Sequence, residues 1–322
     1  MKLNTIAQAA ENKMATRQAY GKTLVELGAE NPNLVVMDAD LSKSTMTADF
    51  SKAYPERFFN MGIAEQNLYG TACGLALSGK VVCASTFAMF AAGRAFEIIR
   101  NSIGYTHANV KVCATHAGIT VGEDGASHQT FEDIALMRTI PGMTVLNPSD
   151  GASAAELIRQ AVAFNGPAYI RLGRASVPTY YTAEAAKELK IGKAATLRQG
   201  KDVAIIATGI MVSEAMMAAE ELEIEHGIEA KVIDMHTIKP IDADAIMKAA
   251  EETGAIVTAE EHSVIGGLGA AVAEVVTTHC PVKMYMVGQQ DTFGESGKPD
   301  ELKAKYGMTK DDIVKGVLTI KK

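Results

Sequence analysis

Short apolar runs rich in β-branched residues alternate along this chain with longer segments whose apolar residues recur at helical spacing. The pattern is typical of a mostly parallel sheet covered by helices, so it predicts an α/β protein. The predicted strands of the first half are residues 34–37, 58–60, 81–85, 110–115, 144–146 and 168–171. Those of the second half are residues 203–207, 230–234, 255–259 and 282–287, with helices that begin near Val212, Asp242 and Gly266.

The alternation is interrupted between residues 175 and 202, where Pro178, paired tyrosines and a lysine-rich piece occur. We therefore predict a first domain over residues 1–180, a linker over residues 181–200 and a second domain over residues 201–322. Each domain is expected to be a mostly parallel sheet flanked by helices. A length of 322 residues with a 48% share of apolar residues is sufficient for two cores.

Composition and charge argue against nucleic-acid binding, membrane insertion and cysteine-based sites. The formal net charge is −7 and long basic runs are absent, which argues against nucleic acid as a partner. No apolar run reaches the roughly 18 residues of a membrane span, and the amino terminus lacks an apolar leader, so we expect a soluble, cytoplasmic protein. The 4 cysteines are widely spaced without a CxxC pattern, so neither a disulfide nor a zinc site is predicted.

The loops after the first-half strands hold most of the unusual polar residues. In open α/β sheets, ligands bind beyond the carboxyl ends of the strands. These loops are residues 38–45, 61–65, 86–90, 116–130, 147–150 and 172–176. The pattern therefore predicts a ligand site at this edge of the first sheet.

Two strings in these loops carry candidate chemistry. GIAEQN at residues 62–67 places Glu65 at a turn between a strand and a small-residue helix predicted over residues 68–77. A glutamate at such a position is often there only because the helix dipole favours it. VGEDGASHQ at residues 121–129 places Glu123, Asp124 and His128 in a glycine-hinged loop, which alone is an ordinary acidic turn.

Together the two strings resemble the pyrimidine-binding domain of the transketolase family, and the similarity extends over almost the whole chain. The resemblance implies the pyrimidine-binding and carboxy-terminal domains of a transketolase, with thiamine diphosphate as cofactor. Glu65 is then the catalytic carboxyl group that hydrogen-bonds N1′ of the pyrimidine ring. Phe87 and Phe90 are implied to contact that ring, and Asp40 is implied to lie close to the cofactor.

The resemblance also assigns residues to the sugar substrate. His128 is implied as the second catalytic residue, facing the amino group of the cofactor and the substrate, and Asp124 is implied to bind a substrate hydroxyl. Residues implied to hold the sugar phosphate are His116, Arg17, Ser44 and Arg174. Several charged or hydroxyl donors are what a phosphate group requires.

The chain departs from the family pattern at three places. It has Gly93 where many transketolases have a tyrosine, and Ala117 and Gly118 where an Asp-Ser pair is usual. It also contains no Gly-Asp-Gly string, the motif that holds Mg²⁺ and the diphosphate in this family. We therefore expect no metal ligand in this chain.

The missing diphosphate half implies a split enzyme. A separate amino-terminal subunit is expected to bind Mg²⁺ and the diphosphate, with this chain dimerising inside a two-plus-two heterotetramer. The implied reaction moves a two-carbon ketol unit between ketose and aldose phosphates, as in the pentose phosphate pathway.

Three alternatives stay open at this point. Deoxyxylulose-phosphate synthase shares strings similar to GIAEQ and GEDG, although His116 in THAG argues against it. The beta subunit of 2-oxoacid dehydrogenases shares the split and the glutamate, although VGEDGASHQ argues against it. A non-catalytic binding or scaffold subunit on the same fold is the third.

The second domain is expected to be structural and dimerising, with no catalytic group. IGGLGAAV at residues 265–272 imitates a dinucleotide fingerprint, but its spacing is poor, and we interpret it as helix packing and capping. His262, beside Glu260 and Glu261, is expected at an interface.

Overall fold

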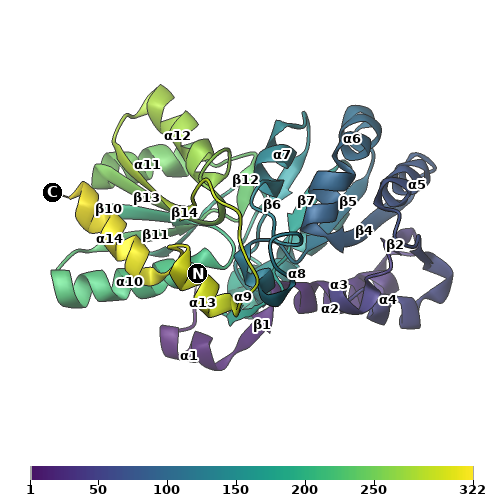
Figure 1. Ribbon diagram of the computed structural model, residues 1–322, viewed down its shortest axis with the longest axis horizontal. Helices are drawn as coiled ribbons and strands as arrows, with labels where there is room; N and C mark the ends of the chain where they lie inside the picture. The colour runs from purple at the N-terminus through teal and green to yellow at the C-terminus, as the bar shows by residue number, and fades with distance from the viewer. Residues whose placement is uncertain (1, 322) are drawn as a thin grey trace.

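Two sheets lie side by side in the computed structural model, which describes residues 2–321 (Figure 1). Helices cover both faces of each sheet, and most neighbouring strands run parallel. The predicted α/β fold is therefore confirmed.

The first sheet has 7 strands in the order β12-β6-β7-β5-β4-β2-β3. Its parallel strands are β2 (Leu34–Asp38), β3 (Phe58–Asn60), β4 (Val81–Phe87), β5 (Val110–Thr115), β6 (Thr144–Leu146) and β7 (Ala168–Arg171). The edge strand β12 (Thr237–Lys239) comes from the second half of the chain and pairs antiparallel with β6.

The second sheet has 5 strands in the order β14-β13-β10-β11-β9. Its parallel strands are β10 (Val203–Ala207), β11 (Ala230–Asp234), β13 (Ala255–Ser263) and β14 (Lys283–Gln289). The edge strand β9 (Ala195–Arg198) pairs antiparallel with β11. A separate two-stranded sheet pairs β1 (Lys13–Ala15) with β8 (Ser176–Pro178).

Apolar clusters fill the space between each sheet and its helices. On the first sheet, one face is covered by α2 (Thr16–Glu30) and α8 (Gly151–Ala163), and the other by α5 (Glu65–Leu77), α6 (Phe96–Ile98) and α7 (Asp133–Thr139). On the second sheet, the faces are covered by α10 (Met211–His226) with α14 (Lys310–Ile320) and by α11 (Ala243–Thr253) with α12 (Leu268–His279).

The remaining helices are short. They are α1 (Ile6–Glu11), α3 (Ser42–Thr45), α4 (Ala48–Ala53), α9 (Ala183–Ala186) and α13 (Pro299–Lys305). Short helical segments of other types are η1 (Pro55–Arg57), η2 (Phe90–Arg94), η3 (Ile99–Gly104) and η4 (Ile119–Asp124). Within residues 2–321, none of the helices combines the length and apolar composition that crossing a membrane requires.

Local sequence explains why these elements form where they do. Strand β2 is buried at every position because parallel strands are covered on both faces, and its sequence LVVMD is accordingly almost continuously apolar. Helix α8 begins at a capping box in which Asp150 and Ser153 satisfy each other's backbone N–H groups. Helices α10 and α11 end at Gly227 and Gly254, which adopt the left-handed conformation that stops a helix.

The two halves of the chain are joined by more than a linker. The predicted linker, residues 181–200, contains α9 and the edge strand β9 of the second sheet. Strand β12 crosses back to the first sheet. The pairing of β9 with β11 crosses residue 200, and the pairing of β12 with β6 crosses both predicted limits. The domain limits at residues 180 and 200 therefore stay a prediction.

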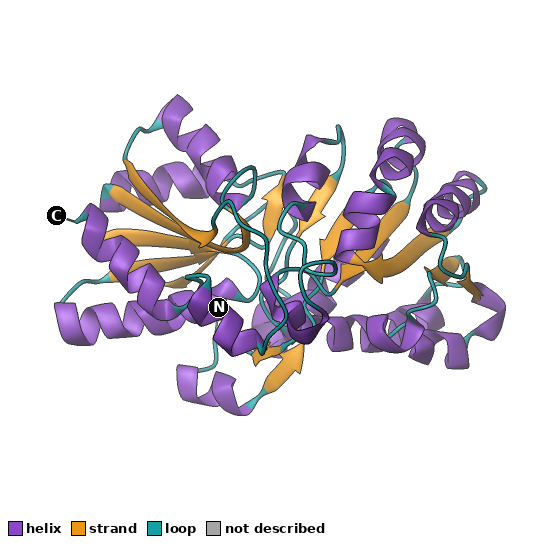
Figure 2. Cartoon of the chain, viewed as in Figure 1, coloured by secondary structure: helices purple, strands orange, loops and turns teal. Residues whose placement is uncertain are grey.

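The topology gathers loops from both halves at one place. Strands β2, β3, β4, β5 and β7 are parallel neighbours, so the loops that follow them share one edge of the first sheet. Figure 2 shows a group of loops between the two sheets, and a hydrogen bond from Thr120 N to Glu261 places the loop after β5 against the end of β13. This junction is the place to look for a functional site.

Candidate functional site

The carboxyl edge of the first sheet carries nearly all of the sequence-predicted site residues. One exception is Arg17, which lies in the first turn of α2. The others follow strands β2, β3, β4, β5 and β7, and they are Asp40, Ser44, Glu65, Phe87, Phe90, His116, Asp124, His128 and Arg174. We call residues 116–130 the histidine loop because its ends carry His116 and His128.

Glu65 is the first residue of α5, and only 3% of it is exposed. Its two carboxylate oxygens accept hydrogen bonds from Arg94 Nη1 at 2.9 and 2.8 Å. The pair lines a cavity of about 410 Å³ with residues 63, 64, 66 and 67. Glu65 is thus a buried carboxylate at the wall of an open cavity, with its charge balanced by a half-exposed arginine.

The two phenylalanines lie beside both histidines of the histidine loop. The rings of Phe87 and Phe90 are nearly parallel, with centroids 6.0 Å apart and an interplanar angle of 14°. His116 stacks on Phe87 at 3.9 Å, and His128 meets the edge of Phe90 at 5.4 Å. The guanidinium of Arg94 lies 4.8 Å above the Phe90 ring, which connects this aromatic cluster to Glu65.

His116 is held neutral in an unusual backbone conformation. Its φ is 56°, and its Nδ1 lies 2.9 Å from Thr115 Oγ1. Burial, together with the nearby charges of Arg17 and Arg174, lowers the pKa of His116 to about 3. At neutral pH its ring therefore acts as a hydrogen-bonding group and carries no charge.

Arg17, Ser44 and Arg174 are brought together from three elements. Arg17 Nη1 donates to the Ser44 carbonyl at 2.6 Å, and Arg17 Nε donates to the Arg174 carbonyl at 3.4 Å. Arg174 Nη1 donates to the Val121 carbonyl at 2.7 Å and pairs with Glu123 at 2.9 Å. Burial and the charge of Arg174 lower the pKa of Arg17. Two guanidinium groups held this close can receive an anion.

The loop that carries Ser44 rests on a buried aspartate. Asp38 accepts hydrogen bonds from Leu41 N at 2.5 Å, Thr45 Oγ1 at 2.6 Å and Thr47 Oγ1 at 3.0 Å. Burial raises the pKa of Asp38. Asp40, by contrast, is exposed with φ 64°, and its side chain accepts from Asn60 Nδ2 at 3.0 Å. The described contacts of Asp40 are with this neighbour and not with the aromatic cluster.

The second string of the sequence forms the rim of the site. Asp124 is exposed at the end of η4, and His128 is partly buried with Nδ1 3.0 Å from Ser127 Oγ. Gln129 is buried beneath them, and its amide donates to the backbone carbonyls of Gly122 at 3.2 Å and Glu295 at 2.9 Å. A loop of the second half of the chain therefore supports the rim.

The departures from the family pattern have structural counterparts. A Cβ on Gly93 would lie 2.4 Å from Met89 Cε, so the methionine methyl group fills the space beside this glycine. Gly118 has φ 79°, and a Cβ there would lie 2.3 Å from the carboxylate carbon of Glu261. A side chain larger than hydrogen at position 118 would displace a residue of the second sheet.

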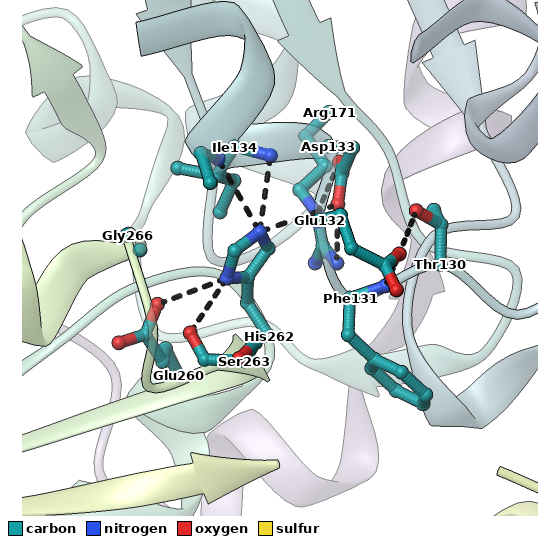
Figure 3. Close-up of polar contacts among 12 residues, drawn as sticks. Thr130, Phe131, Glu132, Asp133, Ile134, Arg171, Glu260, His262, Ser263 and Gly266 are labelled. Atoms are coloured by element: carbon teal, nitrogen blue, oxygen red, sulfur yellow. Dashed lines mark hydrogen bonds and ion pairs between the residues drawn. The ribbon is translucent and has the colours of Figure 1, made fainter. Parts of the chain in front are cut away.

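His262 lies at an interface inside the chain, between the two sheets, and is 0% exposed (Figure 3). Its Nε2 accepts from the backbone N–H groups of Ile134 at 3.2 Å and Ala135 at 3.4 Å, and Nδ1–H donates to the Ser263 carbonyl at 2.8 Å. Asp133 next to it forms an ion pair with Arg171 at 2.8 Å. These contacts fix the start of α7 to the end of β13.

Within residues 2–321 no group of three or more histidine, cysteine, aspartate or glutamate side chains is arranged to hold a metal ion. The 4 cysteines are free in the structure. The glycine-rich string at residues 265–272 spans the start of α12, where Glu260 accepts from the N–H groups of Leu268 at 2.6 Å and Gly269 at 2.7 Å.

Comparison with known proteins decides the family. A family profile for the transketolase pyrimidine-binding domain matches residues 12–179, and a profile for the transketolase C-terminal domain matches residues 192–313. This chain belongs to the transketolase family. A putative transketolase C-terminal section from Methanocaldococcus jannaschii is 52% identical to it over 303 residues, which cover 94% of this chain and 95% of the relative.

Other relatives of this transketolase chain differ in the sugar that their names carry. A 6-deoxy-6-sulfo-D-fructose transketolase subunit from Clostridium sp. (strain MSTE9) is 44% identical to this chain. The match covers 93% of this chain and 92% of the relative. Among solved structures, a split-gene transketolase described as an inactive β4 tetramer has a TM-score of 0.89 at 56% identity. The match covers 96% of this chain and 100% of that one.

Two residues of the site escaped sequence reasoning. Arg94 lies 29 positions from Glu65, and no local signal indicates that η2 turns its side chain onto that carboxylate. Glu261 belongs to the second sheet and reaches the histidine loop across 141 positions. The only hint of this contact in the sequence is Gly118, where the family usually has a serine.

Proposed function

We propose that this chain is the carboxy-terminal subunit of a split transketolase, which transfers a two-carbon ketol unit between ketose and aldose phosphates. The observation that carries the proposal is Glu65, a buried carboxylate at the wall of a cavity and linked through Arg94 to two nearly parallel phenylalanines. A buried acid near two nearly parallel apolar rings fits an aminopyrimidine ring. Thiamine diphosphate, when bound, supplies the electron sink for breaking a bond next to a ketose carbonyl.

Glu65 is assigned the proton shared with N1′ of the pyrimidine ring. Phe87 and Phe90 are assigned the faces of that ring, because apolar aromatic surfaces bind a flat heterocycle and exclude water. In this chain both oxygens of Glu65 are occupied by Arg94. Each carboxylate oxygen can accept more than one hydrogen bond, so the guanidinium of Arg94 and the ring nitrogen would share the Glu65 carboxyl group.

The sugar phosphate is assigned to the group around Arg17 and Arg174. The guanidinium groups supply positive charge, and the neutral ring of His116 supplies a hydrogen bond at the same rim. His128 and Asp124 are assigned the substrate side of the ring because they lie on the histidine loop beside Phe90. Asp40, which is exposed and bonded to Asn60, is proposed only as a neighbour of the cofactor.

The diphosphate and Mg²⁺ are assigned to a partner subunit. This chain has no Gly-Asp-Gly string, and residues 2–321 offer no metal cluster. The names of relatives that match it over nearly their full length support separate subunits, since one is a C-terminal section and another a transketolase subunit. We place this chain in a two-plus-two heterotetramer. The donor sugar stays open because one relative is named for 6-deoxy-6-sulfo-D-fructose and another for apulose 4-phosphate.

Replacement of Glu65 tests the proposal. Glu65→Gln keeps an oxygen that can accept from Arg94, so folding should survive, but an amide cannot share the proton at N1′. In the assembly reconstituted with the diphosphate-binding subunit and saturated with thiamine diphosphate and Mg²⁺, kcat for ketol transfer should fall about 100-fold or more. Glu97→Gln, an exposed change of the same charge, is the matched control and should keep wild-type kcat. A near-normal kcat in Glu65→Gln would remove the assigned role.

A further inference from the structure

The second sheet reaches directly into the predicted substrate site. Glu261 stands near the end of β13 and is only 2% exposed. Its Oε1 accepts the backbone N–H of Thr120 at 2.7 Å. Thr120 follows His116 by four positions, so this bond fixes the turn immediately after that histidine.

The same carboxylate packs on the backbone of Gly118. All three atoms of the group, Cδ, Oε1 and Oε2, lie within 2.6 Å of the place where a Cβ of residue 118 would be. Gly118 also has φ 79°, a conformation that favours glycine. Because glycine leaves this space free, the carboxylate can sit against the chain and bond to Thr120.

Arg171 of the first sheet fixes the position of Glu261. Arg171 Nη2 donates to the Glu261 carbonyl at 2.8 Å, and Arg171 Nη1 lies 3.8 Å from Glu261 Oε2. Arg171 is in turn paired with Asp133 at 2.8 Å. The carboxylate thus has a fixed position, and burial without this pairing would be costly.

We propose that Glu261 is a positioning residue that holds the turn after His116 in the conformation that the sugar phosphate requires. The proposal rests on the proposed function, which places His116 and His128 at the substrate. It also revises the expectation that the second domain is purely structural and dimerising. Glu261 touches neither cofactor nor substrate in this account and acts only through the histidine loop.

Glu260 provides a matched control one residue away. It is also buried, at 0% exposure, but its carboxylate caps the start of α12 through Leu268 N and Gly269 N. Both Glu260→Ala and Glu261→Ala remove a buried carboxylate from the same strand. Only the second removes a contact with the histidine loop.

Amide hydrogen exchange of the chain tests the contact without substrate or partner. In Glu261→Ala the amide of Thr120 loses its acceptor, so exchange over residues 117–122 should become about tenfold faster. In Glu260→Ala the faster exchange should appear at Leu268 and Gly269, with residues 117–122 unchanged. Unchanged exchange over residues 117–122 in Glu261→Ala would overturn the proposal.

Kinetics of the reconstituted enzyme test the consequence. Glu261→Ala should raise KM for a ketose phosphate about tenfold, with a smaller change in kcat, whereas Glu260→Ala should keep the wild-type KM. Glu261→Gln, which retains an oxygen to accept from Thr120, should restore both KM and protection. Equal effects of Glu260→Ala and Glu261→Ala on KM would show a general loss of stability and contradict a positioning role.

Two further results keep the test decisive. If Glu261→Ala does not fold, Glu261→Asp replaces it in both experiments. This variant keeps the charge beside Arg171, but its side chain is shorter by one CH₂ group. Smaller changes in the same direction support the proposal, and wild-type values of both exchange and KM overturn it. If the wild-type assembly transfers no ketol unit, the proposed function fails, while the exchange comparison still decides whether Glu261 holds the turn.

Discussion

At the scale of single residues, the site depends on charges that are partly withdrawn from water. Glu65 is balanced by Arg94, while Arg17 and Arg174 lie close together with like charge. Burial and, to a smaller extent, repulsion by the neighbouring cation Arg174 lower the pKa of Arg17. An anion between them relieves that repulsion, so the arrangement favours a phosphate group over a neutral sugar.

Arg174→Gln tests this assignment. Loss of one charge-assisted contact costs about 1.5–3 kcal/mol, so KM for a ketose phosphate should rise at least about tenfold. Affinity for thiamine diphosphate and kcat should change little, because Glu65 and the phenylalanines are untouched. Arg159→Gln on α8, whose guanidinium pairs with Glu26 and Glu30, is the control for a lost positive charge. A wild-type KM in Arg174→Gln would contradict the phosphate assignment.

Sequence reasoning reached the residues that stand in a recognisable local string and missed those that act across the fold. Glu65 and His128 could be singled out because GIAEQN and VGEDGASHQ resemble family strings. The Glu65 to Arg94 pair could not, because it depends on the turn of η2 after Phe90. The contact of Glu261 with Thr120 requires the relative placement of two sheets, which no local pattern specifies.

At the scale of elements, β13 and α7 join the two halves. The predicted strand over residues 255–259 extends to Ser263 in the structure, and the extra residues are the ones that make the joint. Residues 260–262 are two glutamates and a histidine, a polar run that argues against a buried strand. They are buried because each has a specific hydrogen-bond partner. Glu260 contacts the start of α12, Glu261 the histidine loop and His262 the start of α7. The short edge strands β9 and β12 escaped prediction because three or four residues show no clear period.

His262 makes this joint sensitive to pH. Burial lowers the pKa of His262 to about 4 from 6.5, and protonation would end the acceptance of N–H groups from α7 by Nε2. Because the unfolded chain takes up the proton first, the stability contributed by neutral His262 is present above pH 6.5 and is lost as pH falls toward 4. Asp133, Glu132, Glu260 and Arg171 are the charged groups around the ring.

Comparison with His262→Gln isolates this effect. The difference in unfolding free energy between wild type and His262→Gln should shrink by roughly 2 kcal/mol between pH 7 and pH 5, measured by urea denaturation. Glu260, whose pKa burial raises to about 7, is present in both proteins and largely cancels. His226→Gln, an exposed change on α10, should show no such pH dependence. A difference that stays constant over this range would show that His262 does not titrate as described.

At the scale of the whole molecule, our proposal is that the chain presents one half of a coenzyme site. The buried acid, the two nearly parallel phenylalanines and the neighbouring arginines lie at the carboxyl edge of the first sheet, and residues 2–321 contain no cluster of side chains arranged to hold a metal ion. The sequence predicted this division from the missing Gly-Asp-Gly string together with the GIAEQN and VGEDGASHQ strings. A solved relative at 56% identity is described as a split-gene transketolase in the form of an inactive β4 tetramer.

The most direct measurement is calorimetric titration of thiamine diphosphate with Mg²⁺ into the chain alone and into its mixture with a diphosphate-binding transketolase subunit. We expect no tight binding to the chain alone, and a dissociation constant of about 1 µM or below for the mixture. Micromolar binding to the chain alone would contradict the claim that the site is shared between two polypeptides.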